Sequence, residues 1–352
     1  MRCRVCGTEA TEFPCPHCGF DASQDRELYP TLQNDGRQLS SASLHRSNWE
    51  GYAPQQPRGK ASRRVLPLLL VLLLGLAGIL LYLFHPQWFP FWKYTRSEDG
   101  LYWAVEDGVL TIRGKGAMSP YNYGQSPWYD FRSEVKTVVI EDGVTAIGQW
   151  AFSDFDLVAQ VQLPDSLTEI GAYAFRNCSL LEKVSLSRDL TTIGDGAFMD
   201  CSSITDISFS SKVTSIGDSA FSNCSSLLIA RLPYSIRDIG ASAFSDCTSL
   251  AVVLLPSGLE RLKSSTFSNC ISLKAVHFPD NLSVIGPYAF SCCYSLSSLQ
   301  FPSSLKQLCY HAFFECSILE VYYLGTEEQW SALQIDYGNE AISDAMIHYS
   351  SA

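Results

Sequence analysis

Apolar and polar positions repeat along most of this 352-residue chain with a single period. The motif Ile-Gly-x-x-Ala-Phe returns every 23 residues, and its aromatic residue falls at Phe152, Phe175, Phe198, Phe221, Phe244, Phe267, Phe290 and Phe313. A unit this short cannot bury its own apolar face, so neighbouring units must stack to form a continuous core. The period therefore predicts a solenoid with a long exposed surface, which favours binding over catalysis.

A second block, Leu-x-x-Val-x-Leu, predicts one strand in each unit. It starts at Val135, Val158, Leu181, Ile204, Leu227, Leu250, Leu273, Leu296 and Leu319. Parallel strands pair at a spacing of about 4.8 Å, so the blocks would form one parallel sheet, with short helical turns at the Ala-Phe segments on the other face. We expect repeats over residues 135–322, an N-terminal cap over 97–134 and a C-terminal cap over 323–352.

Two further columns follow the same register. Cysteines fall three residues after each phenylalanine, at Cys178, Cys201, Cys224, Cys247, Cys270, Cys293 and Cys316. A ladder of disulfides or metal ions is one interpretation, but an odd count of seven cannot pair completely, and small buried thiols behave as weak hydrophobes. The preceding residues alternate between Asp and Asn from Asp154 to Asn269, and we expect them to cap the helical turns. We predict an inert internal column, with Cys292 and Cys309 as exceptions.

The combined pattern, Ile-Gly-x-x-Ala-Phe-x-x-Cys followed by Leu-x-x-Val-x-Leu-Pro, resembles the bacterial surface leucine-rich repeats of the BspA type. The resemblance covers residues 97–352, including a lead-in over 101–130 and a closing segment from Tyr323 to Tyr349. It implies a leucine-rich repeat solenoid that serves cell-surface attachment, adhesion or protein binding. It implies no enzymatic chemistry.

Residues 65–84, from Val65 to Phe84, contain no charged side chain and are dominated by leucine. Twenty such residues are long enough to cross a bilayer as a helix. Basic residues from Arg58 to Arg64 precede this segment and an aromatic belt with Trp88 and Trp92 follows it, so the positive-inside rule places the N-terminus in the cytoplasm. A cleaved signal peptide is the alternative, but its charged region would be 64 residues long.

The first 22 residues contain two Cys-x-x-Cys pairs, which are Cys3 with Cys6 and Cys15 with Cys18. Four thiolates at this spacing can hold one structural Zn²⁺ in a tetrahedron. The alternative is a pair of redox motifs, which usually sit in a larger domain. The segment resembles the short zinc ribbons at the N-termini of many bacterial membrane proteins, and residues 23–64 follow it as a polar flexible linker.

The charge of the chain limits its partners. The net charge is −11, and residues 97–352 carry 14 Lys and Arg against 29 Asp and Glu, a balance of −15. Phosphate groups are repelled by such a surface, so we expect no nucleic acid at the repeats. The six histidines form no His-x-x-x-His pair, and no nucleophile elbow or phosphate-binding glycine loop is present.

Strand alternation sends one set of residues outward onto the strand face. Most early repeats have polar residues there, whereas the middle repeats have an apolar patch with a charged rim, formed by Ile229, Arg231, Val252, Leu254 and His277. Such a patch is typical of a partner-binding site. The competing interpretation is that aliphatic residues simply suit strands. The same alternation predicts that Val321 and Tyr323 also point outward.

These observations together predict a single-pass protein of the bacterial cell membrane. We expect the zinc ribbon in the cytoplasm and the repeats outside the cell, where they would bind a protein or glycan partner without enzymatic activity. The alternative is a transmembrane sensor or envelope scaffold that couples external binding to the cytoplasmic ribbon.

Overall fold

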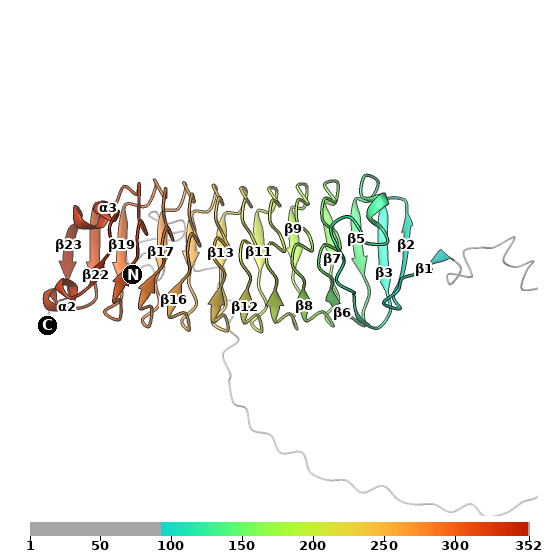
Figure 1. The fold of residues 1–352 in the computed structure, drawn as a ribbon, viewed down its shortest axis with the longest axis horizontal. Helices are drawn as coiled ribbons and strands as arrows, with labels where there is room; N and C mark the ends of the chain where they lie inside the picture. The colour runs from blue at the N-terminus through green and yellow to red at the C-terminus, as the bar shows by residue number, and fades with distance from the viewer. Residues whose placement is uncertain (1–92, 351–352) are drawn as a thin grey trace, which may run out of the picture. The chain divides into compact units, whose positions relative to one another are not determined.

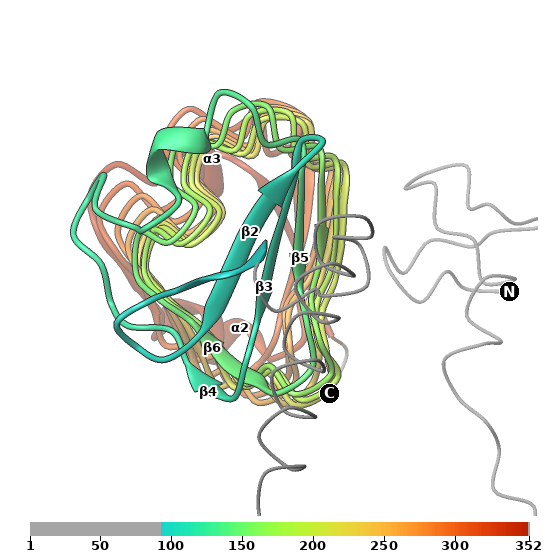
Figure 2. The same cartoon turned by 90° about the vertical axis from the view of Figure 1, so that its right-hand side faces the viewer.

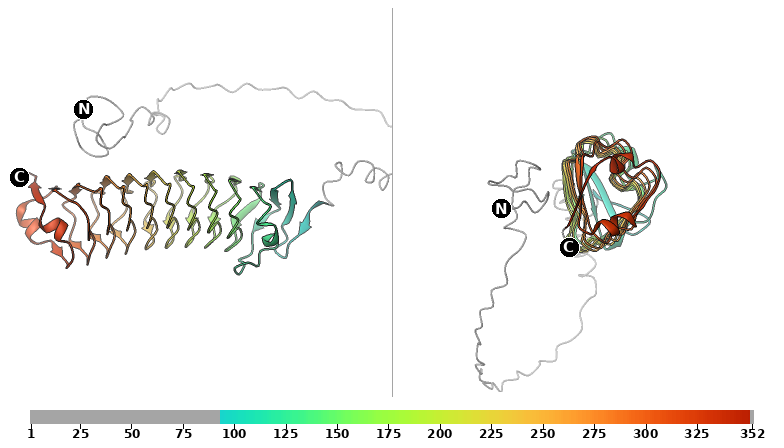
Figure 3. Two further views of the ribbon diagram at one scale, coloured as in Figure 1. Left: turned by 90° about the horizontal axis from the view of Figure 1, so that it is seen from above. Right: turned by 90° about the vertical axis from the view of Figure 1, so that its left-hand side faces the viewer.

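The computed structural model describes residues 93–350, which form a stack of short coils along one axis (Figures 1 and 3). The expected zinc ribbon, linker and membrane helix lie outside these residues. Within residues 93–350, no helix has the length and apolar composition needed to cross a bilayer.

The first side of each coil is one strand of a parallel row. The nine predicted strands are present in this row: β5 (Thr137–Ile140), β7 (Gln160–Gln162), β9 (Lys183–Ser185), β11 (Asp206–Ser208), β13 (Ile229–Arg231), β15 (Val252–Leu254), β17 (Ala275–His277), β19 (Ser298–Phe301) and β21 (Glu320–Tyr323). In β7, β9 and β11 the middle residue is buried and its two neighbours are exposed. This alternation confirms the predicted division between core and strand face.

A second parallel row, which the sequence did not predict, forms another side of the coils. Most of its strands have two residues: β4 (Gly116–Ala117), β6 (Val144–Ile147), β8 (Glu169–Ile170), β10 (Thr192–Ile193), β12 (Ser215–Ile216), β14 (Asp238–Ile239), β16 (Arg261–Leu262), β18 (Val284–Ile285), β20 (Gln307–Leu308) and β22 (Gln334–Ile335). Figure 2 looks along the stack and shows the two strand rows and the turns as three sides of each coil.

The third side, here called the turn edge, comprises residues 148–155 and their equivalents in later coils. The short helical turns expected there are instead a series of turns without helix. Trp150, Phe152 and Asp154 donate their backbone N–H groups to carbonyls of the next coil at 3.0, 2.7 and 2.8 Å. These amides are therefore committed to bonds between coils and cannot form a helix within one coil.

Left-handed backbone at two positions of every coil produces this arrangement. The first column has φ values of 54° to 58° and comprises Trp150, Tyr173, Gly196, Ser219, Ser242, Ser265, Tyr288 and His311. The second has φ values of 56° to 63° and comprises Asp154, Asn177, Asp200, Asn223, Asp246, Asn269, Cys292 and Glu315. A single left-handed residue interrupts a right-handed helix. Two such residues in each coil therefore exclude a helix on the turn edge.

The core along the turn edge is a continuous stack of phenylalanine rings. Neighbouring rings from Phe152 to Phe313 lie 5.1 to 5.4 Å apart between centroids, with interplanar angles of 6° to 14°. All eight side chains are fully buried. Each ring buries a large apolar area and touches one ring on either side, so the stack joins every coil to its neighbours.

The cysteine column is internal, as predicted, and its thiols are hydrogen-bonded. Cys201 donates its Sγ–H to the carbonyl oxygen of Phe175 at 3.1 Å, and the other column cysteines repeat this contact across one coil. Burial raises the pKa of the Cys178, Cys224 and Cys270 thiols well above the ordinary value. Neutral thiols are therefore the stable form at these three positions.

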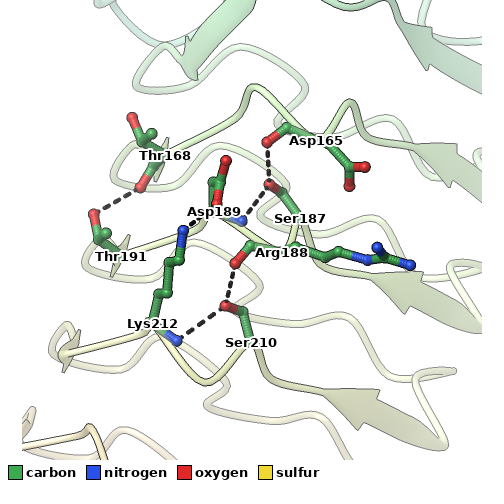
Figure 4. Close-up of polar contacts among 8 residues, drawn as sticks. All are labelled: Asp165, Thr168, Ser187, Arg188, Asp189, Thr191, Ser210 and Lys212. Atoms are coloured by element: carbon green, nitrogen blue, oxygen red, sulfur yellow. Dashed lines mark hydrogen bonds and ion pairs between the residues drawn. The ribbon is translucent and has the colours of Figure 1, made fainter. Parts of the chain in front are cut away.

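Hydroxyl groups add a second set of contacts between coils at the ends of the strands (Figure 4). The hydroxyl of Thr191 donates to the carbonyl oxygen of Thr168 at 3.0 Å, and that of Ser210 donates to the carbonyl oxygen of Arg188 at 2.7 Å. Lys212 forms an ion pair with the Asp189 side chain one coil earlier. That ion pair is exposed and therefore contributes little to stability. The hydroxyl hydrogen bonds contribute more to the stability of the contact between coils.

The register of the last repeat differs from the prediction by one residue. Ser298 pairs with Glu320 rather than with residue 321, so this step is 22 residues long. Ile318 takes the buried position, and Leu319, which was expected to be buried, is 70% exposed. Val321 and Tyr323 consequently point into the core, and the prediction that they face outward is wrong, because a one-residue shift exchanges the two faces of a strand.

The N-terminal end is closed by antiparallel strands. β1 (Thr95–Arg96), β2 (Tyr102–Glu106) and β3 (Val109–Arg113) pair antiparallel, and β3 then pairs in parallel with β5. A short 3₁₀ helix, η4 (Tyr129–Phe131), follows Trp128, whose ring stacks on Phe152 with centroids 5.6 Å apart. Trp128 thus covers the open end of the phenylalanine stack.

The C-terminal end is closed by α2 (Glu327–Ser331), α3 (Glu340–Ser343) and β23 (Met346–Tyr349). No coil follows the last phenylalanine, Phe313. The side chain of Asn339 takes the place of the backbone groups that a following coil would provide. The Oδ1 atom of Asn339 accepts the Phe313 N–H at 3.0 Å, and its Nδ2 group donates to the carbonyls of Cys309 and Asp336 at 2.9 and 2.8 Å. Asn339 is 1% exposed, so these bonds are made away from water.

We predict that Asn339→Ala destabilises the last coil by about 1–3 kcal/mol, because it leaves the buried Phe313 amide without an acceptor. Hydrogen exchange of the amides of residues 309–345, combined with urea unfolding, measures this change. The matched control is Asn122→Ala, since Asn122 makes an exposed hydrogen bond to Gln125. Equal protection of the last coil in both variants would contradict the assigned role of Asn339.

Candidate partner-binding site

The structure brings the five predicted contact residues together on one three-stranded sheet. In the pairing of β13, β15 and β17, Ile229 lies opposite Val252, which lies opposite Ala275. A second row on the same face runs Arg231, Leu254 and His277. This face therefore has two rows of side chains. One row is aliphatic, and in the other Leu254 lies between the basic side chains of Arg231 and His277.

Exposure differs among these residues. Arg231 and His277 are exposed, and Ile229 and Leu254 are partly exposed. Val252 is only 6% exposed, which corrects its assignment as a contact residue. Its branched side chain lies between Ile229 and Ala275 on the two neighbouring strands, and cross-strand neighbours at this spacing cover a short side chain from both sides.

The strands beside this sheet carry polar side chains on the same face. On the N-terminal side the equivalent outward positions hold Lys183 and Ser185 on β9 and Asp206 and Ser208 on β11. The apolar part is three strands wide, which is about 10 Å between the outer strands. A stable protein interface needs roughly 800 Å² on each partner, so this patch can serve only as the centre of a larger contact.

Two exposed apolar residues that the sequence analysis missed flank β13 in the chain. Leu228 precedes β13 and is 52% exposed, and Tyr234 follows β13 and is 67% exposed. The equivalents of Leu228 are Thr205 in the preceding coil and Ala251 and Lys274 in the two following coils. Comparison of equivalent positions between repeats would therefore have identified Leu228 as an unusual exposed leucine.

Arg231 is the residue in this sheet whose side chain is always charged. No residue in the part of the chain that the structure describes forms an ion pair with Arg231. A guanidinium group that is free to make two parallel hydrogen bonds suits a carboxylate on a partner. The aliphatic row beside it would bury apolar area in the same contact.

The predicted metal ligands Cys3, Cys6, Cys15 and Cys18 lie outside the described residues. Across residues 93–350, no group of three His, Cys, Asp or Glu side chains is placed to hold a metal ion. His277, His311 and His348 lie on β17, the turn edge and β23, respectively, and are not brought together. The strand face is thus the candidate site that the described coils offer.

Comparison with known proteins agrees with this architecture. Residues 128–251 and 229–332 match the model of the BspA type leucine rich repeat region, and together these segments make up more than half of the chain. The chain belongs to this family. The matched segments of this BspA-type protein include the whole candidate sheet from β13 to β17.

Solved structures of leucine-rich repeat proteins are similar to this chain. A leucine-rich repeat protein from Bacteroides ovatus is 25% identical to this BspA-type chain, with a TM-score of 0.57 over 74% of this chain and 70% of the other. The leucine-rich repeat protein of T. pallidum is 27% identical over 58% of this chain and 86% of its own, with a TM-score of 0.37. A search of curated proteins gave no match.

Proposed function

We propose that this BspA-type protein is a non-enzymatic, membrane-anchored surface protein whose extracellular repeats bind a protein or glycan partner. The observation that carries the proposal is the interruption of a polar strand face by the β13–β15–β17 sheet. Leu254 lies between Arg231 and His277 there, with Ile229 in the adjacent row. An apolar centre with a charged rim is the usual composition of a binding surface.

The repeat architecture supports binding in preference to catalysis. Solenoids present extended surfaces, and their coils differ mainly in the outward residues. The wide, shallow strand face suits a macromolecular partner better than a small substrate, which is normally held in a concave pocket.

We predict that Leu254→Asp weakens partner binding at least about tenfold, because a buried carboxylate in the centre of the contact is costly. Display of the repeats against purified extracellular proteins and a glycan array would identify the partner, and titration would give the affinities. Ser185→Asp is the matched control, since it adds the same charge to β9, two strands away from the patch. Equal affinities of the two variants would exclude this sheet as the contact.

Membrane anchoring is the second part of the proposal. The uncharged segment 65–84 would span the membrane, with residues 1–64 in the cytoplasm and the repeats outside. With tags at both ends, protease treatment of intact cells should remove the C-terminal tag and leave the N-terminal tag. Survival of both tags until lysis would instead place the repeats inside the cell or behind a protective envelope.

The third part is a structural zinc ion held by Cys3, Cys6, Cys15 and Cys18. Four thiolate ligands leave no open coordination position, so the ion would stabilise the N-terminal segment without catalysing a reaction. We expect about one Zn²⁺ per chain by elemental analysis of the purified protein, and loss of that ion in Cys15→Ser. Cys292→Ser is the control and should retain it; a metal content that is the same in both variants would contradict the assignment.

A further inference from the structure

Five aromatic rings gather on the turn edge of the last coils. His311 lies at their centre: its ring is 3.9 Å from Tyr310, 4.6 Å from Phe314, 5.2 Å from Tyr288 and 5.3 Å from Tyr337, measured between centroids. We call these five residues the ring cluster. The turn edge continues into α3 after the last coil (Figures 1 and 2), so the cluster lies where the repeats meet the C-terminal cap.

Core packing does not account for the ring cluster. Tyr337 is 74% exposed and Tyr310 is 41% exposed, and Tyr288 and Phe314 are each 37% exposed. Tyr288 and His311 also occupy the first left-handed column, where Ser219, Ser242 and Ser265 serve in the middle coils. Trp150 and Tyr173 hold aromatic rings in the same column in the first coils, so this backbone position accepts either a small or a large side chain. The fold therefore holds large rings outward at a position that a serine would satisfy.

The surroundings of the ring cluster are acidic. Residues 286–350 contain seven Asp and Glu and a single basic side chain of the Lys or Arg type, Lys306. Glu315 directly follows Phe314 and is exposed, and Asp336 directly precedes Tyr337. Glu340 begins α3 three residues after Tyr337 and is also exposed. Exposed rings and carboxylates thus occur together on this edge.

The opposite end of the solenoid shows what such rings bind within this protein. There the guanidinium carbon of Arg113 lies 3.6 Å from the Tyr94 ring centroid, and that of Arg132 lies 4.3 Å from the Tyr129 ring centroid. Both contacts are cation–π interactions. At the C-terminal end, residues 286–350 contain no arginine that could cover the ring cluster in this way.

We propose that the ring cluster and its acidic rim form a docking surface for an arginine- or lysine-bearing polypeptide segment. The cation would lie over an exposed ring face of Tyr310 or Tyr337 while the exposed Glu315 and Glu340 supply the opposite charge. Asp336 contributes less, because its two carboxylate oxygens accept hydrogen bonds from Gln307 and Gln334. Tyr310 meets His311 at 72° and Tyr288 at 88°, whereas Tyr310 and Tyr337 are stacked at 28° and Tyr288 and His311 at 20°.

This surface lies on the turn edge and is distinct from the β13–β15–β17 strand face. It would bind independently of the partner proposed above, and Leu254→Asp should leave it unchanged. A failure of one proposal is thus distinguishable from a failure of the other.

The test uses the full-length chain and a fluorescent peptide of alternating glycine and arginine, with fluorescence anisotropy as the measurement. The comparison peptide has citrulline in place of arginine, which removes the charge and keeps the size. The arginine peptide should bind and the citrulline peptide should not, with an affinity that falls as salt is raised. Equal binding of the two peptides would overturn the proposal.

Variants separate the rings from the general negative charge of the repeats. The double variant Tyr310→Leu with Tyr337→Leu should bind the arginine peptide about tenfold more weakly, whereas Tyr310→Phe with Tyr337→Phe should bind as the wild type does. Tyr234→Leu is the matched control, because Tyr234 is 67% exposed and lies outside the cluster. Wild-type affinity in the double leucine variant would overturn the proposal, as would an equal loss in Tyr234→Leu.

A second variant keeps the test valid if the double leucine variant unfolds the last coil. Glu315→Gln with Glu340→Gln changes only exposed carboxylates and should weaken the arginine peptide several-fold, with unchanged circular dichroism. A neutral oligosaccharide serves as a further probe. Binding of that oligosaccharide at the cluster without binding of the arginine peptide would show a glycan site and overturn the proposal.

Discussion

Hydrogen bonding between successive coils is the constraint on which this structure depends. On the turn edge, every second backbone amide donates to a carbonyl of the next coil, as Phe198 does to Ala220 at 2.8 Å and Phe221 does to Ala243 at 2.8 Å. Such bonds form only when equivalent residues stand in line from coil to coil. The phenylalanine rings and the cysteine thiols then stack at the same repeat distance, so one register serves all three kinds of contact. The outermost coils have no neighbour, which is why Trp128 and Asn339 are needed at the two ends.

Much of the core could be predicted because a strict period reveals which residues are equivalent. The phenylalanine stack, the internal cysteines and the strand row all follow from the 23-residue spacing. The left-handed columns could not be predicted, because Trp150, Ser219 and His311 carry no glycine signal. The two-residue strands of the second row are too short to show an alternation. The shortened last repeat was missed because Ile318 and Leu319 are both apolar, so the sequence pattern fits either register.

The candidate strand face was predicted in position but not in detail. Alternation along β13, β15 and β17 placed the five residues on one face, as the structure shows. Burial of Val252 depends on which residues stand beside it on neighbouring strands, and this is a property of the whole sheet rather than of one strand. The ring cluster was missed for a related reason. Its members come from two coils and the C-terminal cap, and contacts that the sequence does not reveal bring the cap into place, among them the bond from the His311 amide to the Tyr337 carbonyl at 3.0 Å.

Departures from the repeat therefore carry more information than the repeat itself. In the second left-handed column Asp and Asn alternate, and Asn177, Asn223 and Asn269 each donate an amide to the preceding aspartate at 2.9, 3.0 and 2.6 Å. Aspartates in successive coils would repel one another. With Asn in every second coil, each carboxylate accepts a hydrogen bond from a neutral amide instead. The alternation ends at Cys292 and Glu315, where a carboxylate no longer has an amide partner and instead accepts the Tyr294 hydroxyl at 3.1 Å. The first column changes from serine to Tyr288 and His311 in the same two coils. The first column carries aromatic rings at Trp150 and Tyr173 as well, so it holds small side chains only in the middle coils, whereas the second column leaves its Asp–Asn alternation only in the last two coils.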